Sequence, residues 1–210
     1  RTGARTLTIA NTNQNGGVFL LTNDASVNRF EQLTLRSENK STSSGTIVFA
    51  GAASVAGNQQ NIITNCDIRE GATVPANGIY AYNTVGKTAE AIVNNTNTIS
   101  NNNIYNFSNA GVILNVYGAN YRWDVSGNSV YNTQTIVAPS SVNGIYVVAN
   151  EGANANSLVN NNFIGGQAPS CGGAAFEASG TGMFTGITAL TGSGSAATAI
   201  EVQGNTIQNI

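Results

Sequence analysis

The chain has 210 residues, of which only 9% are charged, and its formal net charge is −2 with no histidine. The weak charge and the lack of a basic run exclude the electrostatic features of nucleic-acid binding, and the lack of histidine excludes Ser-His-Asp and Cys-His nucleophile systems and the usual zinc sites. A hydrophobic content of 41% is enough for a core, and no apolar run approaches the roughly 18 residues of a membrane-spanning helix, so we expect a single domain over residues 1–210 and no membrane insertion.

A series of short apolar runs along the chain each begins with a glycine. Residues 17–21 form the first run, and the next four begin at Gly45, Gly78, Gly111 and Gly144, with a constant spacing of 33 residues. A fixed period in this range indicates a solenoid. The runs are rich in β-branched and aromatic residues and are bounded by Gly, Asn and Ser, which is typical of strands.

A second motif, with the pattern apolar, any, Asn or Gly, Asn, any, apolar, runs in step with the first. Four copies match it fully, at residues 99–104, 125–130, 159–164 and 202–207. The copy at 63–68 has Cys66 in the fourth place, the copy at 30–35 has Leu33 there, and the segment 4–9 is the weakest copy. Because the spacing varies while the motif is constant, we expect rigid rungs joined by loops of unequal length.

Each repeat therefore holds three strand candidates. One strand ends on the first apolar place of the Asn motif, a second starts from its last apolar place, and the third is the glycine-led run. This plan predicts an all-β fold, a right-handed, three-stranded parallel β-helix of about six rungs. Neither end of the sequence shows an amphipathic capping helix, so we expect the chain to be a segment of a longer protein.

The Asn motif predicts a sharp corner between two strands, because Asn and Gly tolerate the left-handed backbone conformation best. Side chains in its fourth place would stack one rung apart, at roughly 4.8 Å. Each amide would then donate a hydrogen bond to the carbonyl of the next. The predicted structural ladder contains Asn102, Asn128, Asn162 and Asn205, with Cys66 as an apolar, inward-facing member.

The two cysteines, Cys66 and Cys171, belong to rungs three apart in this alignment. A disulfide needs Cα atoms within about 7 Å. We therefore expect two thiols and no bridge, with Cys66 acting as a small buried apolar side chain.

The connections from the glycine-led strands to the next Asn motif vary most in length. They cover residues 50–60, 83–95, 116–121, 149–156 and 178–198. All of them leave from one corner of the predicted coil, and such an edge is often functional in solenoids. The sequence leaves open whether loops 83–95 and 178–198 bind anything.

Alignment of the rungs gives an outer column on the strands that follow the Asn turn. Arg36 lies over Arg69, followed by Tyr105 and Tyr131, and Asp67 lies on the same face. One interpretation is a solvated surface in which Asp67 pairs with an arginine. The other is an enzyme site in which the arginines bind an acidic sugar while Asp67 or a tyrosine acts as acid or base. The few isolated aspartates make a poor calcium site, and we expect no metal and no cofactor.

The glycine-led strands give a second outer column, formed by Phe19, Val48, Tyr80, Ile113 and Tyr146. An apolar stripe on consecutive rungs is unusual for a face exposed to solvent. It is explained either by cover from the chain's own loops or a neighbouring domain, or by docking of another chain or a glycan. In the second case, Tyr80 and Tyr146 would be stacking platforms beside Ile113.

The segments 99–104, 125–130 and 202–207 resemble the rungs of right-handed β-helix proteins of the pectate-lyase-like superfamily, and the resemblance covers residues 4–210. That superfamily includes polysaccharide lyases and hydrolases, phage tailspikes and bacterial surface proteins. Its lyases commonly use clustered aspartates for calcium, and its polygalacturonase-type hydrolases use several aspartates on neighbouring rungs; neither cluster has a match here. The Asn- and Thr-rich, charge-poor composition is similar to that of exported bacterial surface proteins, particularly Bacteroidota-type adhesins.

These observations lead us to expect a non-catalytic structural or adhesive segment of a large secreted or cell-surface bacterial protein. Its partners would be a glycan or other extracellular protein chains. One alternative is a β-helix polysaccharide lyase or glycoside hydrolase that uses the face with Arg36 and Arg69. Another is a subunit of an extracellular assembly that docks through the apolar column with Tyr80 and Tyr146.

Overall fold

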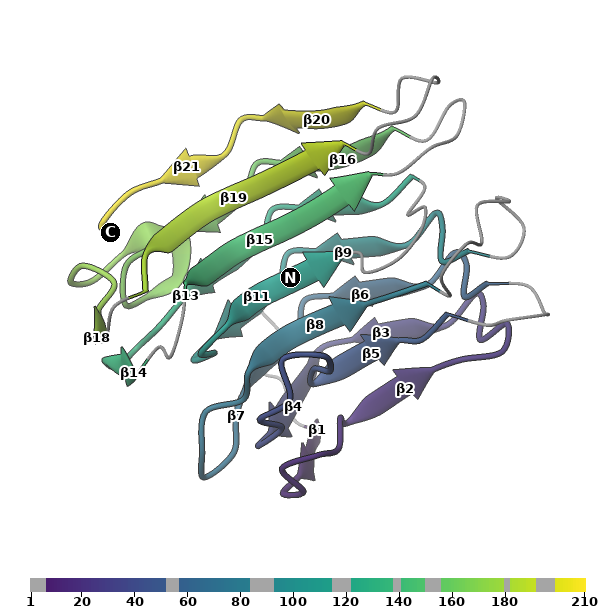
Figure 1. Ribbon diagram of the computed structural model, residues 1–210, viewed down its shortest axis with the longest axis horizontal. Helices are drawn as coiled ribbons and strands as arrows, with labels where there is room; N and C mark the ends of the chain where they lie inside the picture. Colours follow the sequence, from purple (N-terminus) through teal and green to yellow (C-terminus); the bar gives the residue numbers. More distant parts are fainter. Residues whose placement is uncertain are drawn as a thin grey trace.

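The computed structural model describes residues 7–51, 57–83, 93–114, 122–137, 141–149, 156–179, 182–191 and 199–210. Within these ranges the chain forms parallel β-sheets, and the one helical segment is a short 3-10 turn at Pro169–Cys171. The predicted all-β class is therefore confirmed at the level of parallel sheets (Figure 1).

Three large sheets hold nearly all of the described strands. Sheet I contains β1 (Leu7–Asn11), β4 (Leu33–Ser37), β7 (Asp67–Glu70), β10 (Asn103–Tyr105), β13 (Ser129–Tyr131), β17 (Phe163–Ile164) and β21 (Thr206–Ile207). Sheet II contains β2 (Phe19–Leu21), β5 (Ile47–Phe49), β8 (Asn77–Ala81), β11 (Ala110–Leu114), β15 (Val142–Ala149) and β19 (Phe184–Thr191). Sheet III contains β3 (Arg29–Glu31), β6 (Ile62–Thr64), β9 (Thr98–Ser100), β12 (Asp124–Ser126), β16 (Ser157–Asn160) and β20 (Ile200–Gln203). A small fourth sheet pairs β14 (Ile136–Val137) with β18 (Ala178–Ser179).

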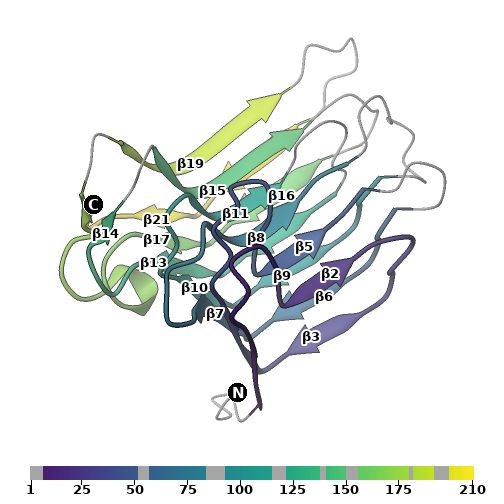
Figure 2. The ribbon, with the colours of Figure 1, turned by 60° about the horizontal axis from the view of Figure 1, so that its bottom comes forward.

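The chain visits the three large sheets in a fixed cycle. It runs from a strand of sheet I to one of sheet II, then to one of sheet III, and returns to sheet I beside its starting strand. Each strand pairs in parallel with its equivalent from the previous turn, as β8 does with β5 and β11. Figure 2 shows the sheets around a common interior, an arrangement consistent with a parallel β-solenoid.

The interior between the sheets is filled by columns of apolar side chains. The fully buried members include Leu35, Ile68, Ile104, Val130 and Ile164 from sheet I, Ile47, Ile79, Val112 and Ile145 from sheet II, and Ile63, Ile99, Val125 and Val159 from sheet III. Phe49 and Trp123 meet edge to face in this core, with ring centroids 5.0 Å apart. Full burial of each such side chain contributes about 1.5–3 kcal/mol, so the stacked columns are the main source of stability.

The corner between sheets III and I has the backbone conformation that the Asn motif predicted. The third residue of the motif has a positive φ in successive rungs, at Asn65, Asn101, Gly127, Asn161 and Gly204. Asn and Gly adopt this left-handed region at the lowest cost. The motif thus places a tight turn at the same point of each of these rungs.

The spacing of 33 residues between Gly45 and Gly78 does not correspond to the strand register. Ile47 pairs with Ile79, so Thr46, and not Gly45, lies opposite Gly78. The inward apolar side chains determine this register, because a shift by one residue would turn them outward.

The glycine column continues instead through Gly78, Gly111, Gly144 and Gly186. A Cβ atom on Gly111 would lie 2.6 Å from a methyl group of Val130 and 2.7 Å from the carbonyl oxygen of Gly144. These glycines let β8, β11, β15 and β19 approach the core closely near their starts.

The prediction of a loop over residues 178–198 is wrong for its central part. Strand β19 (Phe184–Thr191) lies there and pairs with β15, with Asn143 opposite Thr185. The long connection between β17 and β19 breaks the repeat spacing, and the threonines of β19 make its apolar pattern weak. Of the remaining predicted loops, 116–121 lies wholly and 83–95 and 149–156 lie largely outside the described residues, as do residues 52–56 of the loop 50–60 and residues 192–198.

Candidate functional site

The outer column on sheet I has the predicted order. Arg36 pairs in register with Arg69, and Tyr105 pairs with Tyr131. The guanidinium carbon of Arg69 lies 5.9 Å from the centre of the Tyr105 ring, and the Tyr105 and Tyr131 rings stack in parallel at 4.8 Å. Arg69 therefore contacts Tyr105, and Tyr105 contacts Tyr131, each one rung away. Cation–π attraction joins the arginine part of the column to the tyrosine part.

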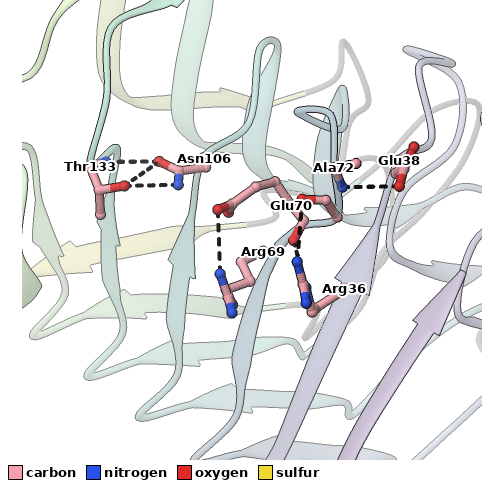
Figure 3. A network of polar contacts seen from close by, with 8 residues as sticks. Arg36, Glu38, Arg69, Glu70, Ala72, Asn106 and Thr133 are labelled. Carbon is pink, nitrogen blue, oxygen red and sulfur yellow. Dashed lines mark hydrogen bonds and ion pairs between the residues drawn. The ribbon is translucent and has the colours of Figure 1, made fainter. Parts of the chain in front are cut away.

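The charged groups near this column are held by contacts within the chain (Figure 3). Arg36 donates from Nε to the carbonyl oxygen of Glu70 at 3.2 Å, and Arg69 lies 3.4 Å from the Glu70 carboxylate. Glu38, which is almost fully buried, accepts a hydrogen bond from the backbone N–H of Ala72 at 2.9 Å. The network thus fixes the turn after β7 against the rung below it.

Asp67, the proposed acid or base of the enzyme alternative, is engaged in the same way. Its Oδ1 atom accepts a hydrogen bond from the Asn103 side chain at 2.9 Å, across the pairing of β7 with β10. One carboxylate oxygen of Glu70 is buried and makes no hydrogen bond with the described residues. Its ion pair with Arg69 offsets part of the cost of that burial.

The predicted ladder of asparagines is present at the corner between sheets III and I. The Nδ2 atom of Asn102 donates to Oδ1 of Asn128 at 3.0 Å, Asn128 donates to Asn162 at 3.0 Å, and Asn162 donates to Asn205 at 2.9 Å. Cys66 continues the column through its backbone N–H, which donates to Oδ1 of Asn102 at 2.9 Å. These amides satisfy backbone groups that would otherwise be buried without partners.

A second ladder, at the corner between sheets II and III, was missed in the sequence. Asn28 donates to Asn61 and Asn61 donates to Asn97, each through Nδ2 at 3.0 Å. The spacings of 33 and 36 residues between them equal those of the neighbouring motif copies, which is the signal that could have revealed the ladder. Its role is structural, like that of the first.

The two cysteines form no disulfide, as predicted. The Cys66 sulfur lies 3.3 Å from the carbonyl oxygen of Thr64 and is fully buried. Burial raises the pKa of the Cys171 thiol. Since an ordinary thiol already titrates near about 8.5, Cys171 stays protonated at neutral pH and is a poor nucleophile.

The outer column of sheet II is present, with one correction at its first member. Val48, Tyr80, Ile113 and Tyr146 are in register, whereas Phe19 packs against the interior core and Leu20 takes the outward place, where it is 65% exposed. Tyr80 is only 5% exposed and Ile113 only 9%. The chain itself therefore covers most of this column, and Tyr146 is its more accessible ring.

Among the residues that the structure describes, two hollows lie at the corner between sheets I and II, and the smaller of them borders this column. The larger, of about 590 Å³, is lined by Lys40, Thr42, Val74, Ala76, Ser108, Asn109, Gln134, Thr135, Ile136 and Val137. The smaller, of about 380 Å³, is lined by Thr42, Ser43, Tyr80, Asn109, Ile113, Asn143 and Tyr146. The hollows share Thr42 and Asn109, and neither is lined by Arg36, Asp67, Arg69 or Tyr105.

Comparison of the chain with protein-family models, with curated proteins and with solved structures gave no match. In the part of the chain that the structure describes, no group of His, Cys, Asp or Glu side chains is arranged to hold a metal ion. No helix formed by these residues is long and apolar enough to cross a bilayer.

Proposed function

We propose that this chain is a right-handed, three-stranded parallel β-helix that serves as a non-catalytic structural and adhesive segment of a larger secreted or cell-surface protein. The cyclic order of the three sheets supports the coil. Connections between parallel strands of one sheet are right-handed in about 98% of cases, which supports the handedness.

The observation that carries the non-catalytic role is the use of the charged side chains. Arg36 is hydrogen-bonded to the turn after β7, Arg69 lies between Glu70 and the Tyr105 ring, and Asp67 is hydrogen-bonded to Asn103. All of these contacts link parts of the chain to one another, and the two hollows lie at a different place. A polysaccharide-degrading site would instead direct such groups into a groove that holds the sugar.

A location outside the cell or on its surface is supported by composition. Neutral polar residues supply the surface, and only 9% of the chain is charged. The ladders show how such residues are used, because Asn side chains stabilise the corners without ion pairs.

The test is a turnover assay on the intact chain. Polygalacturonate, xylan and a mixed-linkage β-glucan are incubated with the protein, with and without calcium, and new reducing ends are measured. We expect no turnover. Cleavage that is lost in both Arg69→Ala and Asp67→Asn, but retained in the surface control Gln203→Ala, would establish the enzyme alternative instead.

The alternative of an assembly subunit that docks through the outer face of sheet II is less well supported. Tyr80 and Ile113 have little exposed area left for a flat partner. The face has a hollow at its edge beside Tyr146. Such a hollow suits a narrow ligand better than a broad protein surface.

A further inference from the structure

The hollows at the corner between sheets I and II arise from unequal connections between consecutive rungs. Residues 106–109 link β10 to β11 and form the shortest of these connections. The flanking connections, 38–46 and 71–76 on one side and the segment with β14 on the other, are longer. The short connection therefore leaves a notch with Ser108 and Asn109 in its lining and longer segments as walls.

The notch continues onto the outer face of sheet II. The two hollows meet at Thr42 and Asn109, and the second extends from there to Tyr146. We call the two adjoining hollows together the corner groove. Each of its parts, at about 590 Å³ and 380 Å³, falls within the range of roughly 300–1,000 Å³ that is typical of small-ligand sites.

The groove combines apolar surface with neutral hydrogen-bonding groups. Within the described part of the chain, the side-chain amide of Gln134, the Nδ2 atom of Asn143 and the hydroxyl of Tyr146 make no hydrogen bond, so a ligand in the groove can bond to them. Lys40 is the one charged residue among those that line it. Such a lining suits a ligand with several hydroxyl groups, apolar ring faces and little charge.

The backbone along the groove is already used by the chain itself. The N–H groups of Ala76, Ser108 and Asn109 donate to carbonyl oxygens one rung below, and that of Asn143 donates to Asn109. A peptide that adds as a strand needs an unpaired backbone edge, which these positions do not offer. Recognition therefore depends on side chains, and this favours a sugar chain over an extended peptide.

We propose that the corner groove binds a neutral oligosaccharide, with one sugar ring against the Tyr146 side chain and hydroxyl groups bonded to Gln134 and Asn143. This inference rests on the proposed function and specifies the ligand of the adhesive segment. The nearly buried Tyr80 and Ile113 form a firm support for that side of the groove.

The test measures binding to the intact chain by isothermal titration calorimetry. The probes are the neutral hexasaccharides cellohexaose, xylohexaose and mannohexaose, the acidic hexagalacturonate, and a library of hexapeptides. We expect saturable binding of at least one neutral hexasaccharide without cleavage. Tyr146→Ala should weaken that binding about tenfold, as expected for the loss of one aromatic contact and one hydrogen bond.

Gln134→Ala, on an exposed segment, keeps the proposal testable if Tyr146→Ala fails to fold, and it should weaken binding severalfold. Its matched control is Gln203→Ala, an exposed glutamine on sheet III that should leave binding unchanged. Absence of binding by all neutral probes, tighter binding of hexagalacturonate, or preference for a peptide would each overturn the inference. Those outcomes would leave the proposed structural role intact, whereas cleavage of a probe would refute that role.

Discussion

At the scale of single residues, asparagine performs in this chain the role that charged residues perform in many proteins. A primary amide is both donor and acceptor, so a column of them passes hydrogen bonds from rung to rung without a net charge. Asn128 shows the full pattern: its Oδ1 accepts from the backbone and side chain of Asn102, and its Nδ2 donates to Asn162 and to the carbonyl oxygen of Ile99. The cost of losing one amide is therefore spread over several buried groups.

Replacement of Asn128 by alanine tests this ladder. It removes the acceptor of the Asn102 backbone N–H and one of the two acceptors of Asn102 Nδ2, and it removes the side-chain donor to the Ile99 carbonyl. A buried polar group that loses its partner costs about 1–3 kcal/mol. We expect Asn128→Ala to lower the free energy of unfolding by about 3 kcal/mol or more, measured by urea denaturation followed by circular dichroism. Asn15→Ala, at an exposed asparagine, is the matched control and should change stability by less than about 0.5 kcal/mol. Equal effects of the two substitutions would contradict a structural ladder.

Cys66 marks the place where the ladder stops, and it offers the converse experiment. Its sulfur lies 3.6 Å from the carbonyl oxygen of Phe30. In the next rung the equivalent carbonyl, that of Ile63, accepts a hydrogen bond from Nδ2 of Asn102. In Cys66→Asn the new Nδ2 can donate to Phe30 and to Oδ1 of Asn102, so we expect unchanged or higher stability, by up to about 1 kcal/mol. Thermal unfolding of Cys66→Asn and Cys66→Ser decides the point, since serine is too short to reach Asn102. A larger loss in the asparagine variant than in the serine variant would count against the ladder geometry.

At the scale of elements, the strands beside the Asn motif could be predicted well because one local signal determines both the turn and the burial. The strands predicted to end at Val125 and Val202, the first apolar places of two motif copies, are found at Asp124–Ser126 and Ile200–Gln203, each ending one residue later. Strand β19 was missed because its position depends on pairing with β15. The paired residues Asn143 and Thr185 are 42 positions apart in the sequence. This spacing exceeds the 33 residues between most of the glycine-led runs, and it fits the repeat only when the segment with β18 is treated as an insertion into it.

The sheet II strands depend on glycine for a steric reason that Gly111→Ala can test. A Cβ there would lie 2.6 Å from the Val130 side chain and 2.7 Å from the Gly144 carbonyl oxygen, so neighbouring strands must move apart. We expect a loss of about 1–3 kcal/mol, the usual cost of overpacking, together with a lower melting temperature by differential scanning calorimetry. Gly172→Ala is the comparison, because its nearest neighbour would be 3.1 Å away and it lies outside the three sheets. The prediction fails if Gly172→Ala is the more damaging of the two.

At the scale of the whole molecule, the repeated core could be predicted from the sequence, but the candidate groove could not. The inward columns follow from alternation and spacing, whereas the corner groove depends on the difference in length between neighbouring connections and on which side chains line the resulting notch. Gln134 and Asn143 carry no motif in the sequence and acquire significance only when β14 and β15 place them beside Ser108 and Tyr146. The outer column with Tyr146 was visible in advance, and cover by the chain itself was one of the two explanations that the sequence offered for it.

The sparse charge of the whole chain leads to a final prediction about salt. Of the ion pairs among the described residues, Arg29 with Glu31 is largely exposed and Arg69 with Glu70 is partly exposed, and exposed pairs contribute about 0–1 kcal/mol. Apolar columns and neutral amide ladders supply the rest of the stability, and these are hardly screened by ions. We therefore expect the urea midpoint to stay nearly constant between 20 and 200 mM sodium chloride, a range over which the Debye length shortens about threefold. A change in unfolding free energy of more than about 1 kcal/mol over this range would mean that charge–charge contacts stabilise the coil far more than its ladders indicate.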